Sequence, residues 1–396
     1  MKYGEGKELL FILEQIGDPR HPRGVRYRFA DLLFICIYAV LSGHSEASEI
    51  AFYAELNLEY FKEMTRIGQA PSHDTFSRVL RMVDFEGLSL SLGSWLTETF
   101  PEIYEKYEDK KVLHIDGKAV RGASEKSAGE GPRYLLNAMY EGESIGLKLR
   151  EVGEKENEIS CMPEYLKLFA LTDTIVTIDA MGCNKTVVDA ITKAGGDYVL
   201  PVKENQKGLL GTIEKKIEKL KKTGEYEKLD CTEQINKGHG RIEKLRARMI
   251  KDTSFIYEKQ GLKSFLGTIA RIGVIEKTII QQEKGKESRS QTRQIMITSL
   301  EEISIENLVK IKQAHWNIEM QHWLLDMQLN EDKKTARKDH AMISGAILRR
   351  FCLMMKKRDK KYAKKPMKQF LMANEHDICR VEELLFGSPM MDGEGF

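Results

Sequence analysis

Two stretches decide the fold: KVLHIDGKAVRG at residues 111–122 and TIVTIDAMGCNK at residues 174–185. Each opens with aliphatic and β-branched residues, which is typical of a buried strand. Each strand ends in an aspartate, Asp116 or Asp179, that is followed by a glycine within three residues. A carboxylate at the end of a strand is held rigidly and faces the crevice where α/β sheets bind their ligands.

Two such carboxylates on neighbouring strands would converge. Close like charges are costly unless a cation neutralises them, and oxygen ligands favour Mg²⁺. Two Mg²⁺ ions about 4 Å apart can activate an attacking oxygen and stabilise a leaving oxygen in phosphodiester cleavage. The alternative is that the two aspartates are unrelated and cap turns, and the pattern alone leaves both interpretations open.

A third candidate acid is Glu319, in HWNIEMQHWLLD at residues 315–326. On a helix, His315, Glu319, His322 and Asp326 fall within a strip about 60° wide. We expect a helix that is packed by its tryptophans and aims this strip in one direction; the alternative is a half-buried helix with a hydrated polar edge. The neighbouring apolar face consists of Trp316, Met320, Trp323 and Met327.

Outward from these stretches, the pattern predicts an α/β (mixed α+β) fold. Three short β runs lie close together and predict antiparallel strands, after which strands and helices alternate. This order predicts a mixed sheet with helices on both faces. The antiparallel strands are expected at 111–116, 133–140 and 145–153, and the later elements are a helix at 158–171, a strand at 174–179, a helix at 183–195 and a strand at 197–203.

Residues 207–300 are predicted to form an inserted β-rich subdomain that does not belong to this sheet. An amphipathic basic helix at 207–222 opens it, and β-rich runs fill 226–300. A structureless loop of this length would be improbable in a compact domain. Helices at 305–326 and 340–357 follow, and then a basic tail.

Residues 1–108 are predicted to be a helical domain. The stretch 28–43 is too apolar for a surface helix, so we expect it at the centre of a small bundle and stopped by Gly43. The segment PSHDTFSRVLRMVD at 71–84 is either a helix-turn-helix reading element or an ordinary bundle helix. Its apolar stripe is Phe76, Val79, Leu80 and Val83.

Composition excludes several classes of protein. The chain has 396 residues, 41% hydrophobic and 31% charged, which is a soluble globular profile. The longest apolar run, 32–41, is about half of what a bilayer crossing needs, so we expect no membrane association. The N-terminus does not resemble a signal peptide, and the six cysteines form no CxxC pair, which suits a reducing cytoplasm.

Charge is distributed unevenly, although the formal net charge is only +2. Between Lys333 and Lys368 there are fourteen Lys and Arg residues against two acids. A second basic run contains no acid. Such runs predict a polyanionic partner, and the alternative is a solvated helical face. The second run consists of Arg20, Arg23, Arg26 and Arg28, together with His21.

Together these stretches resemble the DDE transposases of bacterial insertion sequences, in the subgroup with an H-W-x-I-E block before a second H-W. The resemblance covers nearly the whole chain and keeps its order. In the N-terminal region it rests on GDPRHPRGVRYRFADLL (17–33) and PSHDTFSRVL (71–80). In the remainder it rests on HIDGKAVRG (114–122), KENEI (155–159), TIDAMG (177–182), DYVLPVKENQ (197–206), GHGRIEKL (238–245), HWNIEMQHWLLD (315–326) and LNED (329–332).

The resemblance implies a ribonuclease-H-like catalytic core with a metal-binding triad of Asp116, Asp179 and Glu319. It implies two Mg²⁺ ions, for which Mn²⁺ can substitute. The expected partners are double-stranded DNA, both the terminal inverted repeats of the element and the target, and a second copy of the chain in the synaptic complex. The expected activity is cleavage of DNA strands followed by strand transfer by the freed 3′-hydroxyl.

The chain departs from the family pattern near Glu319. The Tyr, Arg and Lys positions of the broader superfamily signature hold Lys312, His315 and Asp326, a signature that the subgroup largely lacks as well. The subgroup usually has Arg before H-W and Asn after I-E, where this chain has Gln313 and Met320. These changes leave the three acids intact and affect the positioning of DNA beside them.

Further residues are predicted to bind DNA, each against a structural alternative. Polar residues after the strand 197–203 could hold a phosphate or a flipped base, or form a polar loop; a glycine-flanked arginine could bind phosphate, or close a hairpin. The two histidines near Glu319 are expected to stack or to donate hydrogen bonds rather than to bind metal. The candidates are Arg121, Lys203, Asn205, Gln206, His239, Arg241, His315, Trp316 and His322.

The predicted organisation therefore has five parts: a DNA-binding helical domain at 1–108, the first part of the core at 109–206, the insertion at 207–300, the helical end of the core at 301–357, and a basic tail at 358–396. Two other functions stay open. One is a ribonuclease-H-like nuclease or resolvase without strand transfer. The other is a decayed copy that only binds DNA.

Overall fold

The computed structural model divides the chain into two compact units. The first contains residues 1–103, 117–153 and 320–396, and the second contains residues 104–116 and 154–319. The residues described are 5–99, 106–107, 109–120, 133–141, 149–152, 158–238, 241–257, 268–283, 286–329, 331 and 340–387.

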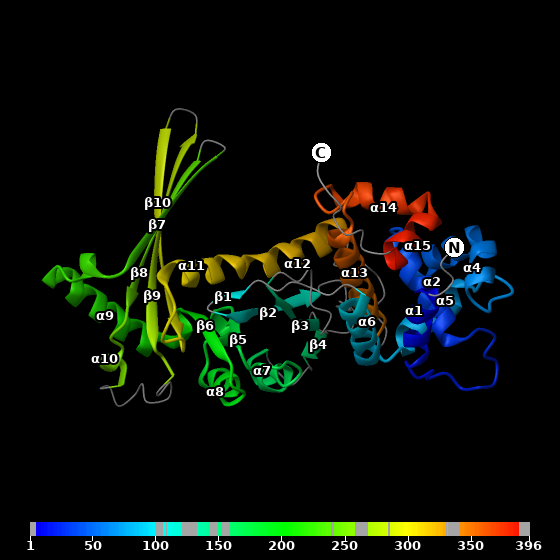
Figure 1. Ribbon diagram of the computed structural model, residues 1–396, viewed down its shortest axis with the longest axis horizontal. Coiled ribbons are helices and arrows are strands. Elements are labelled where there is room, and N and C mark those ends of the chain that lie inside the picture. Colours follow the sequence, from blue (N-terminus) through cyan, green and yellow to red (C-terminus); the bar gives the residue numbers. More distant parts are fainter. Residues whose placement is uncertain are drawn as a thin grey trace, which may run out of the picture. The chain divides into compact units, whose positions relative to one another are not determined.

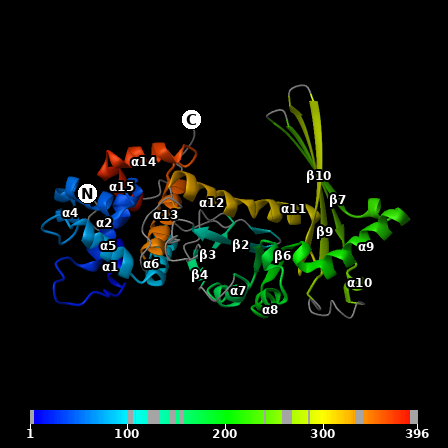
Figure 2. The same cartoon turned by 180° about the vertical axis from the view of Figure 1, so that it is seen from behind.

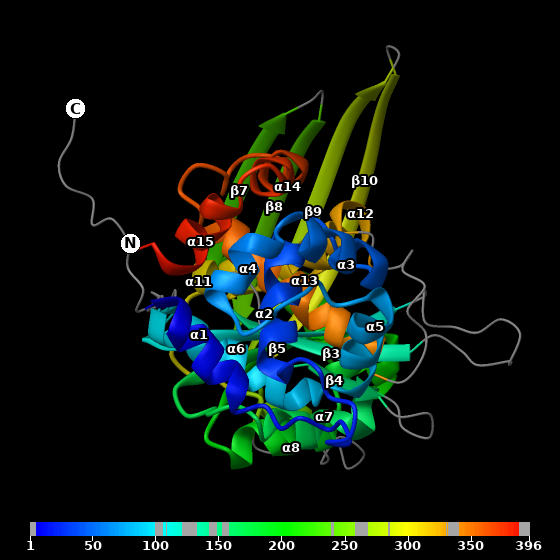
Figure 3. The ribbon, with the colours of Figure 1, turned by 90° about the vertical axis from the view of Figure 1, so that its right-hand side faces the viewer.

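The first unit is built around α2 (Phe29–Leu41), whose residues are all buried. Figure 3 shows α2 among the other helices of this unit, and α13 (Ala341–Arg358) packs on α2 and on two further helices, α5 and α6. Because α2 is apolar on every side, it can only be stable inside a bundle. The other helices are α1 (Glu5–Glu14), α3 (Ala47–Leu56), α4 (Leu58–Met64), α5 (His73–Met82), α6 (Phe85–Thr99), α14 (Met367–Glu375) and α15 (Ile378–Phe386).

Gly43 ends α2 as predicted. Its φ of +92° lies in the left-handed region, which glycine adopts without steric cost. The amides of Gly43 and His44 then donate to the carbonyls of Val40 and Ala39, at 3.1 and 2.8 Å. This is a Schellman motif, and it satisfies the carbonyls that the end of the helix leaves open.

The prediction of a basic tail at 358–396 is wrong for residues 367–386. These residues form α14 and α15, which pack on α2 in the same unit. Phe370, Val381 and Leu385 are fully buried there. The lysines of the predicted tail lie in 358–368, and these apolar residues that pack α14 and α15 follow them.

The second unit contains a mixed sheet with strand order β2-β5-β6-β10-β9-β8-β7, and β1 (Lys106–Tyr107) pairs with β2. Strands β2, β5 and β6 are parallel, whereas β10 is antiparallel to β6 and the strands beyond it alternate in direction. The strands are β2 (Lys110–Val120), β5 (Thr174–Ile178), β6 (Asp197–Val202), β7 (Cys231–Gly238), β8 (Arg241–Ile250), β9 (Arg271–Glu283) and β10 (Lys286–Thr298).

Strand β2 runs across the division, with Gly117–Val120 in the first unit. β3 (Arg133–Tyr140) and β4 (Leu149–Val152) pair antiparallel, and β3 lies between β4 and β2 in the strand order. The sequence predicted this run of neighbouring strands. The mixed α+β class is confirmed, and the arrangement is consistent with a ribonuclease-H-like fold.

The expectation that residues 207–300 stand apart from the sheet is wrong. Strand β10 pairs with β6, with Ile295 opposite Val202 and Thr298 opposite Val199. An unpaired β6 would leave a row of open backbone groups, and β10 closes that edge. Figures 1 and 2 show β7 to β10 as one long ribbon that continues from β6 and is flanked by α9 (Lys207–Thr223).

Helices cover both faces of the second unit's sheet. α7 (Glu158–Leu166) and α8 (Lys185–Lys193) lie on one side of β5 and β6, and α11 (Ile305–Ala314) lies on the other (Figure 1). Leu308 of α11 is fully buried, and a Cβ at Gly273 of β9 would stand only 2.8 Å from its side chain. A glycine at this position therefore lets α11 approach the sheet closely.

The predicted helix at 305–326 is two helices. α11 ends at Ala314, and α12 (Trp316–Gln328) begins two residues later, with His315 at the junction. Among the described helices, none combines the length and the apolar character that a membrane crossing requires.

Candidate active site

The register of the two parallel strands places Asp116 beside Asp179. Ile115 of β2 is the Cα partner of Ile178 of β5, and each aspartate is the next residue of the chain. Asp179 directly follows β5 as predicted, whereas β2 continues past Asp116 to Val120, so the expectation that Asp116 ends its strand is wrong. Asp179 also caps the short turn Ala180–Gly182, where its carboxylate accepts hydrogen bonds from the amides of Met181 at 2.9 Å and Gly182 at 3.4 Å. The convergence expected from the sequence is therefore present at this edge of the sheet.

Gly182 shapes the turn after Asp179. A Cβ at this position would lie 2.5 Å from the Cβ of Ile178, so a larger residue would force the chain away from β5. The turn could then no longer direct its amides at the Asp179 carboxylate. The glycine that the sequence pattern places three residues after Asp179 is therefore required for a steric reason.

The electrostatics of Asp179 show an unrelieved negative charge. Burial raises the pKa of this carboxyl, and the neighbouring charge of Asp116 raises it further. The amides of Gly182 and Met181 and the ammonium group of Lys203 act in the opposite direction without cancelling the rise in pKa. A cation that bound here would relieve this repulsion.

Glu319 lines the same cleft as Asp179. The cleft has a volume of about 240 Å³ and lies between the ends of β5 and β6, strand β10, and the junction of α11 with α12. The helix predicted at 305–326 would place Glu319 far from either helix end, and this is wrong: Glu319 lies in the first turn of α12 and is exposed. Charged and aromatic side chains in the lining are Asp179, Lys203, Lys312, His315, Trp316 and Glu319.

A buried hydrogen-bond chain fixes the start of α12. Thr177 Oγ1 lies 2.7 Å from Nδ1 of His114 on β2 and 2.8 Å from Nδ1 of His315 at the helix junction. Thr177 and His114 are almost completely buried. The threonine hydroxyl thereby links the strand that carries Asp116, its own strand and the helix that carries Glu319. Sequence reasoning missed Thr177, although its position two residues before Asp179 and the polar pair His114 and Thr177 inside apolar strands were visible signals.

Two lysines supply positive charge to the cleft. Lys203 was predicted as a DNA-binding residue, and it lines the cleft beside Asp179. Lys312 was not predicted as a functional residue, yet it lines the same cleft. Burial lowers the pKa of Lys312, and so does the charge of Lys277, while Glu319 opposes the shift. The signal for Lys312 was its spacing, since it lies seven residues before Glu319 and therefore on the same helical face.

Asn205 and Gln206 hold the loop after Asp179. The side-chain amide of Asn205 donates to the carbonyl of Ala180 at 2.6 Å, and that of Gln206 donates to the carbonyl of Cys183 at 2.9 Å. Both side chains therefore brace the turn that Asp179 caps. Cys183 is fully buried.

Two other residues that were predicted to bind DNA do not line this cleft. The guanidinium of Arg241 pairs with Glu243 on β8. In the first unit, His322 Nε2 lies 3.4 Å from the side-chain nitrogen of Asn137. Arg121 and His239 fall outside the residues that the structure describes.

The expectation that tryptophans pack α12 is wrong. Trp316 and Trp323 are 60% and 50% exposed, whereas Ile318 and Leu325 are fully buried. The helix is therefore held by its aliphatic side chains, and the tryptophans face solvent. Trp316 contributes to the cleft from this exposed face.

Other acids near Glu319 in the sequence are paired with cations in the first unit. Asp326 accepts from the Lys118 ammonium at 2.6 Å. Glu331 is buried, binds Lys118, and accepts from the guanidinium of Arg350 at 2.9 Å. These carboxylates are neutralised by the protein itself, which distinguishes them from Asp179.

The donor set fits a divalent cation in part. Asp116 and Asp179 offer the carboxylate oxygens that Mg²⁺ prefers, and their mutual repulsion favours a bound cation. Within the described residues, no three His, Cys, Asp or Glu side chains converge as a ready-made metal cage. Glu319 shares the cleft and would have to move closer to complete a triad.

Comparison with known proteins agrees with this geometry. The family model described as "Transposase DDE domain" matches residues 107–355, and the model described as "DDE_Tnp_1-associated" matches residues 10–96. The chain belongs to the DDE transposase family. The resemblance seen in the sequence is confirmed.

Two relatives of this transposase come from Escherichia coli. It is 30% identical over 344 residues to the K12 protein named "H repeat-associated putative transposase YhhI", which covers 85% of this chain and 87% of that protein. It is 28% identical over 388 residues to the O157:H7 protein named "Putative transposase YncI", which covers 96% of this chain and 94% of that protein.

One solved structure, an S-adenosylmethionine-dependent methyltransferase from Clostridium acetobutylicum, aligns with a TM-score of 0.14 at 8% identity, over 37% of this chain and 48% of that chain. A score this low has no bearing on the fold of the transposase.

Proposed function

We propose that this transposase binds the terminal inverted repeats of its own element, cleaves DNA there and joins the freed 3′-hydroxyl to target DNA. The observation that supports this proposal most is the adjacent pair Asp116 and Asp179, in which burial and then the charge of Asp116 raise the pKa of Asp179, in a cleft that Glu319 also lines. Members of the DDE transposase family generally use divalent metal ions, and these three acids are the proposed ligands.

The bound ions, Mg²⁺ or Mn²⁺ and two in number, would supply charge stabilisation to the attacking and leaving oxygens of a phosphodiester. Lys203 and Lys312 lie in the same cleft and would hold the non-bridging phosphate oxygens. Trp316 offers an exposed ring on which a base can stack. Thr177, through His114 and His315, would keep the Glu319 helix at the distance that the reaction requires.

Assembly follows from the same proposal. Two copies of the chain would hold the two ends of the element in one complex, and the protein would act on the bacterial nucleoid within the cytoplasm. A nuclease that hydrolyses without strand transfer has the same cleft chemistry, so the joining step is tested separately from cleavage.

The test uses labelled duplexes that carry the ends of the element together with supercoiled target DNA. We expect cleavage and joining with Mg²⁺ or Mn²⁺, and loss of both in Asp116→Asn and Asp179→Asn while DNA binding persists. The matched control is Asp230→Asn, an exposed carboxylate of the same unit that pairs with Lys251 outside the cleft. Undiminished cleavage by Asp179→Asn would remove Asp179 from the site, and cleavage without joining would favour the nuclease.

A second readout does not depend on activity. A ligand that binds only the folded state raises the unfolding free energy, by about 2.7 kcal/mol at one hundred times its dissociation constant. We therefore expect Mn²⁺ to raise the melting temperature of the wild type, and to raise it much less in the two aspartate variants.

A further inference from the structure

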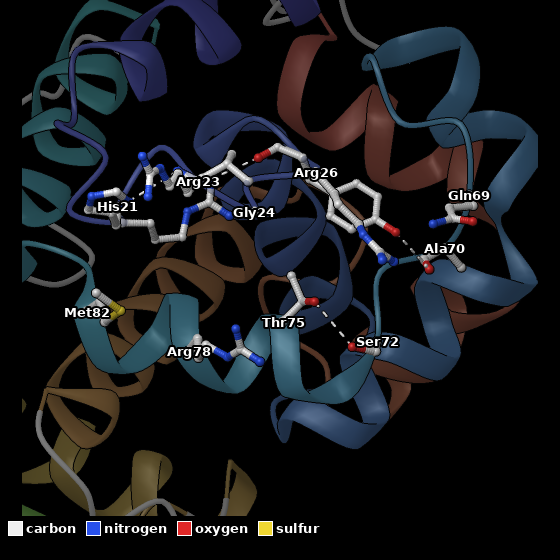
Figure 4. A pocket seen from close by; sticks show the side chains of 13 residues that line it. His21, Arg23, Gly24, Arg26, Gln69, Ala70, Ser72, Thr75, Arg78 and Met82 are labelled. Atoms are coloured by element: carbon white, nitrogen blue, oxygen red, sulfur yellow. Dashed lines mark hydrogen bonds between the residues drawn. The ribbon is translucent and has the colours of Figure 1, made fainter.

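The first unit contains a basic pocket that is separate from the acids of the candidate active site. The loop between α1 and α2 and one face of α5 enclose a cavity of about 670 Å³ (Figure 4). No acidic side chain is among the described residues that line it. Its basic lining residues are Arg20, His21, Arg23, Arg26 and Arg78.

Helix α5 is split into an apolar face and a polar face. Phe76, Val79 and Leu80 are buried in the bundle, as their spacing predicted. The opposite stripe of Ser72, Thr75, Arg78 and Met82 lines the pocket (Figure 4). The helix is therefore a packed member of the bundle and also presents a surface to a ligand.

The arginines of the loop divide into two kinds. Arg20 binds Asp18 through two contacts of 2.8 Å and also donates to the carbonyl of Tyr27, and Arg28 pairs with Glu14 and Asp31. These two arginines stabilise the loop and are not available to an anion.

Arg23, Arg26 and Arg78 differ from that pair. All three are exposed, and within the described part of the chain none forms an ion pair. Figure 4 shows the three side chains around the same hollow, with Arg78 reaching it from a segment fifty residues further along the chain. Three guanidinium groups without a counter-charge raise the local positive potential, which an anion would relieve.

We propose that this pocket binds the sugar–phosphate backbone of duplex DNA through Arg23, Arg26 and Arg78. A guanidinium group binds phosphate in a bidentate fashion, and hydroxyl groups such as those of Ser72 and Thr75 commonly complete backbone contacts. Two of the described lining residues carry rings, and both rings make contacts within the wall of the pocket. Nδ1 of His21 accepts from the amide of Arg23 at 3.2 Å, and the hydroxyl of Tyr27 donates to the carbonyl of Ala70 at 3.4 Å.

The lining favours a polymer over a nucleotide. A nucleotide site needs a surface for the base and an acceptor for the ribose hydroxyls, and the described lining contains no carboxylate that could serve as one. The contacts are also of a kind that positions DNA without specifying its sequence. The identity of the polymer rests on the proposed function, whereas the location of the pocket does not.

The test measures binding of a fluorescent duplex over a range of KCl concentrations without divalent metal. We expect the combined variant Arg23→Gln, Arg26→Gln and Arg78→Gln to bind more weakly and to lower the log–log salt slope by about 0.9 for each lost contact. The loss should be similar for element ends and for unrelated duplexes. The matched control is Lys62→Gln on α4, a residue that pairs with Glu59 outside the pocket and should leave the slope unchanged.

The melting temperature of the triple variant should stay that of the wild type, because the three side chains are exposed and stabilise no partner. An unchanged salt slope would overturn the proposal. Saturable binding of inorganic phosphate or of duplex RNA that depends on these arginines, with the DNA slope unchanged, would overturn it as well. Salt-dependent binding through the pocket by a wild-type protein that cannot cleave would overturn the proposed function alone.

Discussion

Replacing Thr177 by valine removes one buried hydroxyl group and leaves the side-chain volume almost unchanged. Oγ1 of this threonine makes two short hydrogen bonds, to His114 and to His315, at 2.7 and 2.8 Å. Thr177 is 2% exposed and His114 is fully buried, so water cannot replace the lost partner. The substitution therefore tests the link between the two strands and the Glu319 helix.

The magnitude follows from these two bonds. A typical hydrogen bond contributes about 0.5–1.5 kcal/mol net, and a buried polar atom that loses its partner costs about 1–3 kcal/mol. For Thr177→Val we expect the free energy of unfolding to fall by about 2–4 kcal/mol. Thr177→Ser keeps the hydroxyl and loses one methyl group, so its loss should be about 1 kcal/mol.

Urea unfolding monitored by circular dichroism measures the loss of stability. Single-turnover cleavage of a duplex that carries an end of the element measures the effect on the reaction rate. A misplacement of about 1 Å at a reacting group can cost about a hundredfold in rate. We therefore expect cleavage by Thr177→Val to slow by about 10- to 100-fold with unchanged DNA affinity, and near-normal cleavage by Thr177→Ser. Equal stability and equal rates in the valine variant and the wild type would refute the positioning role.

Three further outcomes are expected. Glu319→Ala should abolish cleavage, whereas Asp326→Ala should reduce it only in part, because Asp326 already pairs with Lys118; equal loss in two folded, DNA-binding variants would contradict this assignment. Glu331→Gln should destabilise the fold by about 3–5 kcal/mol in thermal or urea unfolding, since it leaves the buried Arg350 without its counter-charge and leaves Lys118 with Asp326 alone, and a neutral effect would contradict the buried ion network. Neutralising Lys360 and Lys361, which are exposed, should lower the salt slope of DNA binding by nearly one unit per phosphate contact, and an unchanged slope would make them ordinary surface residues.

Within the basic run at 333–368, several of the other basic residues are enclosed by the fold, which is why we expect phosphate contacts from Lys360 and Lys361 and not from the whole run. Arg349 and Arg350 are buried beside Glu331, and Lys356 donates to the carbonyl of Ala363 at 2.8 Å. Burial lowers the pKa of Lys357 to about 8. A count of charges cannot distinguish a solvated lysine from one that the fold has enclosed, because the distinction depends on tertiary neighbours.

The strands that carry Asp116 and Asp179 were predictable because a buried parallel strand consists mostly of apolar residues, here interrupted only by His114 within 112–115 and by Thr177 within 175–178. The helix bundle was predictable for a similar reason, since 28–43 is apolar on every side. The sequence did not predict which strands pair with one another. Nothing local in residues 286–298 indicates that β10 pairs with β6, which lies more than eighty residues earlier, so the sequence pattern predicts a separate subdomain.

The orientation of α12 could not be predicted from the sequence either. Its tryptophans and its aliphatic residues both lie on apolar stripes, and periodicity gives the stripes without saying which one is buried. The structure buries Ile318 and Leu325 and exposes Trp316 and Trp323. Glu319 still reaches the predicted cleft, because it lies beside Trp316 on the exposed side of the helix.

The surroundings of Glu331 and of Asp179 shift the pKa values of these two acids in opposite directions. Burial opposes ionisation of Glu331, but Arg350, Lys118 and Arg349 outweigh it and hold its pKa far below the usual range. Because this folded-state pKa is depressed, its contribution to stability is present above the unfolded pKa of about 4.3 and is lost as the pH falls further.

Asp179 shows the reverse. Burial and the charge of Asp116 raise its pKa, so its ionisation at neutral pH works against folding, and Asp179→Asn should raise the melting temperature of the metal-free protein at pH 7 while leaving it unchanged at pH 3. Mn²⁺ should produce the same stabilisation in the wild type, because a bound cation and a neutral amide relieve the same repulsion. A lower melting temperature for Asp179→Asn at pH 7 would mean that the hydrogen bonds from Met181 and Gly182 outweigh the repulsion, and the argument for a cation at this pair would then fail.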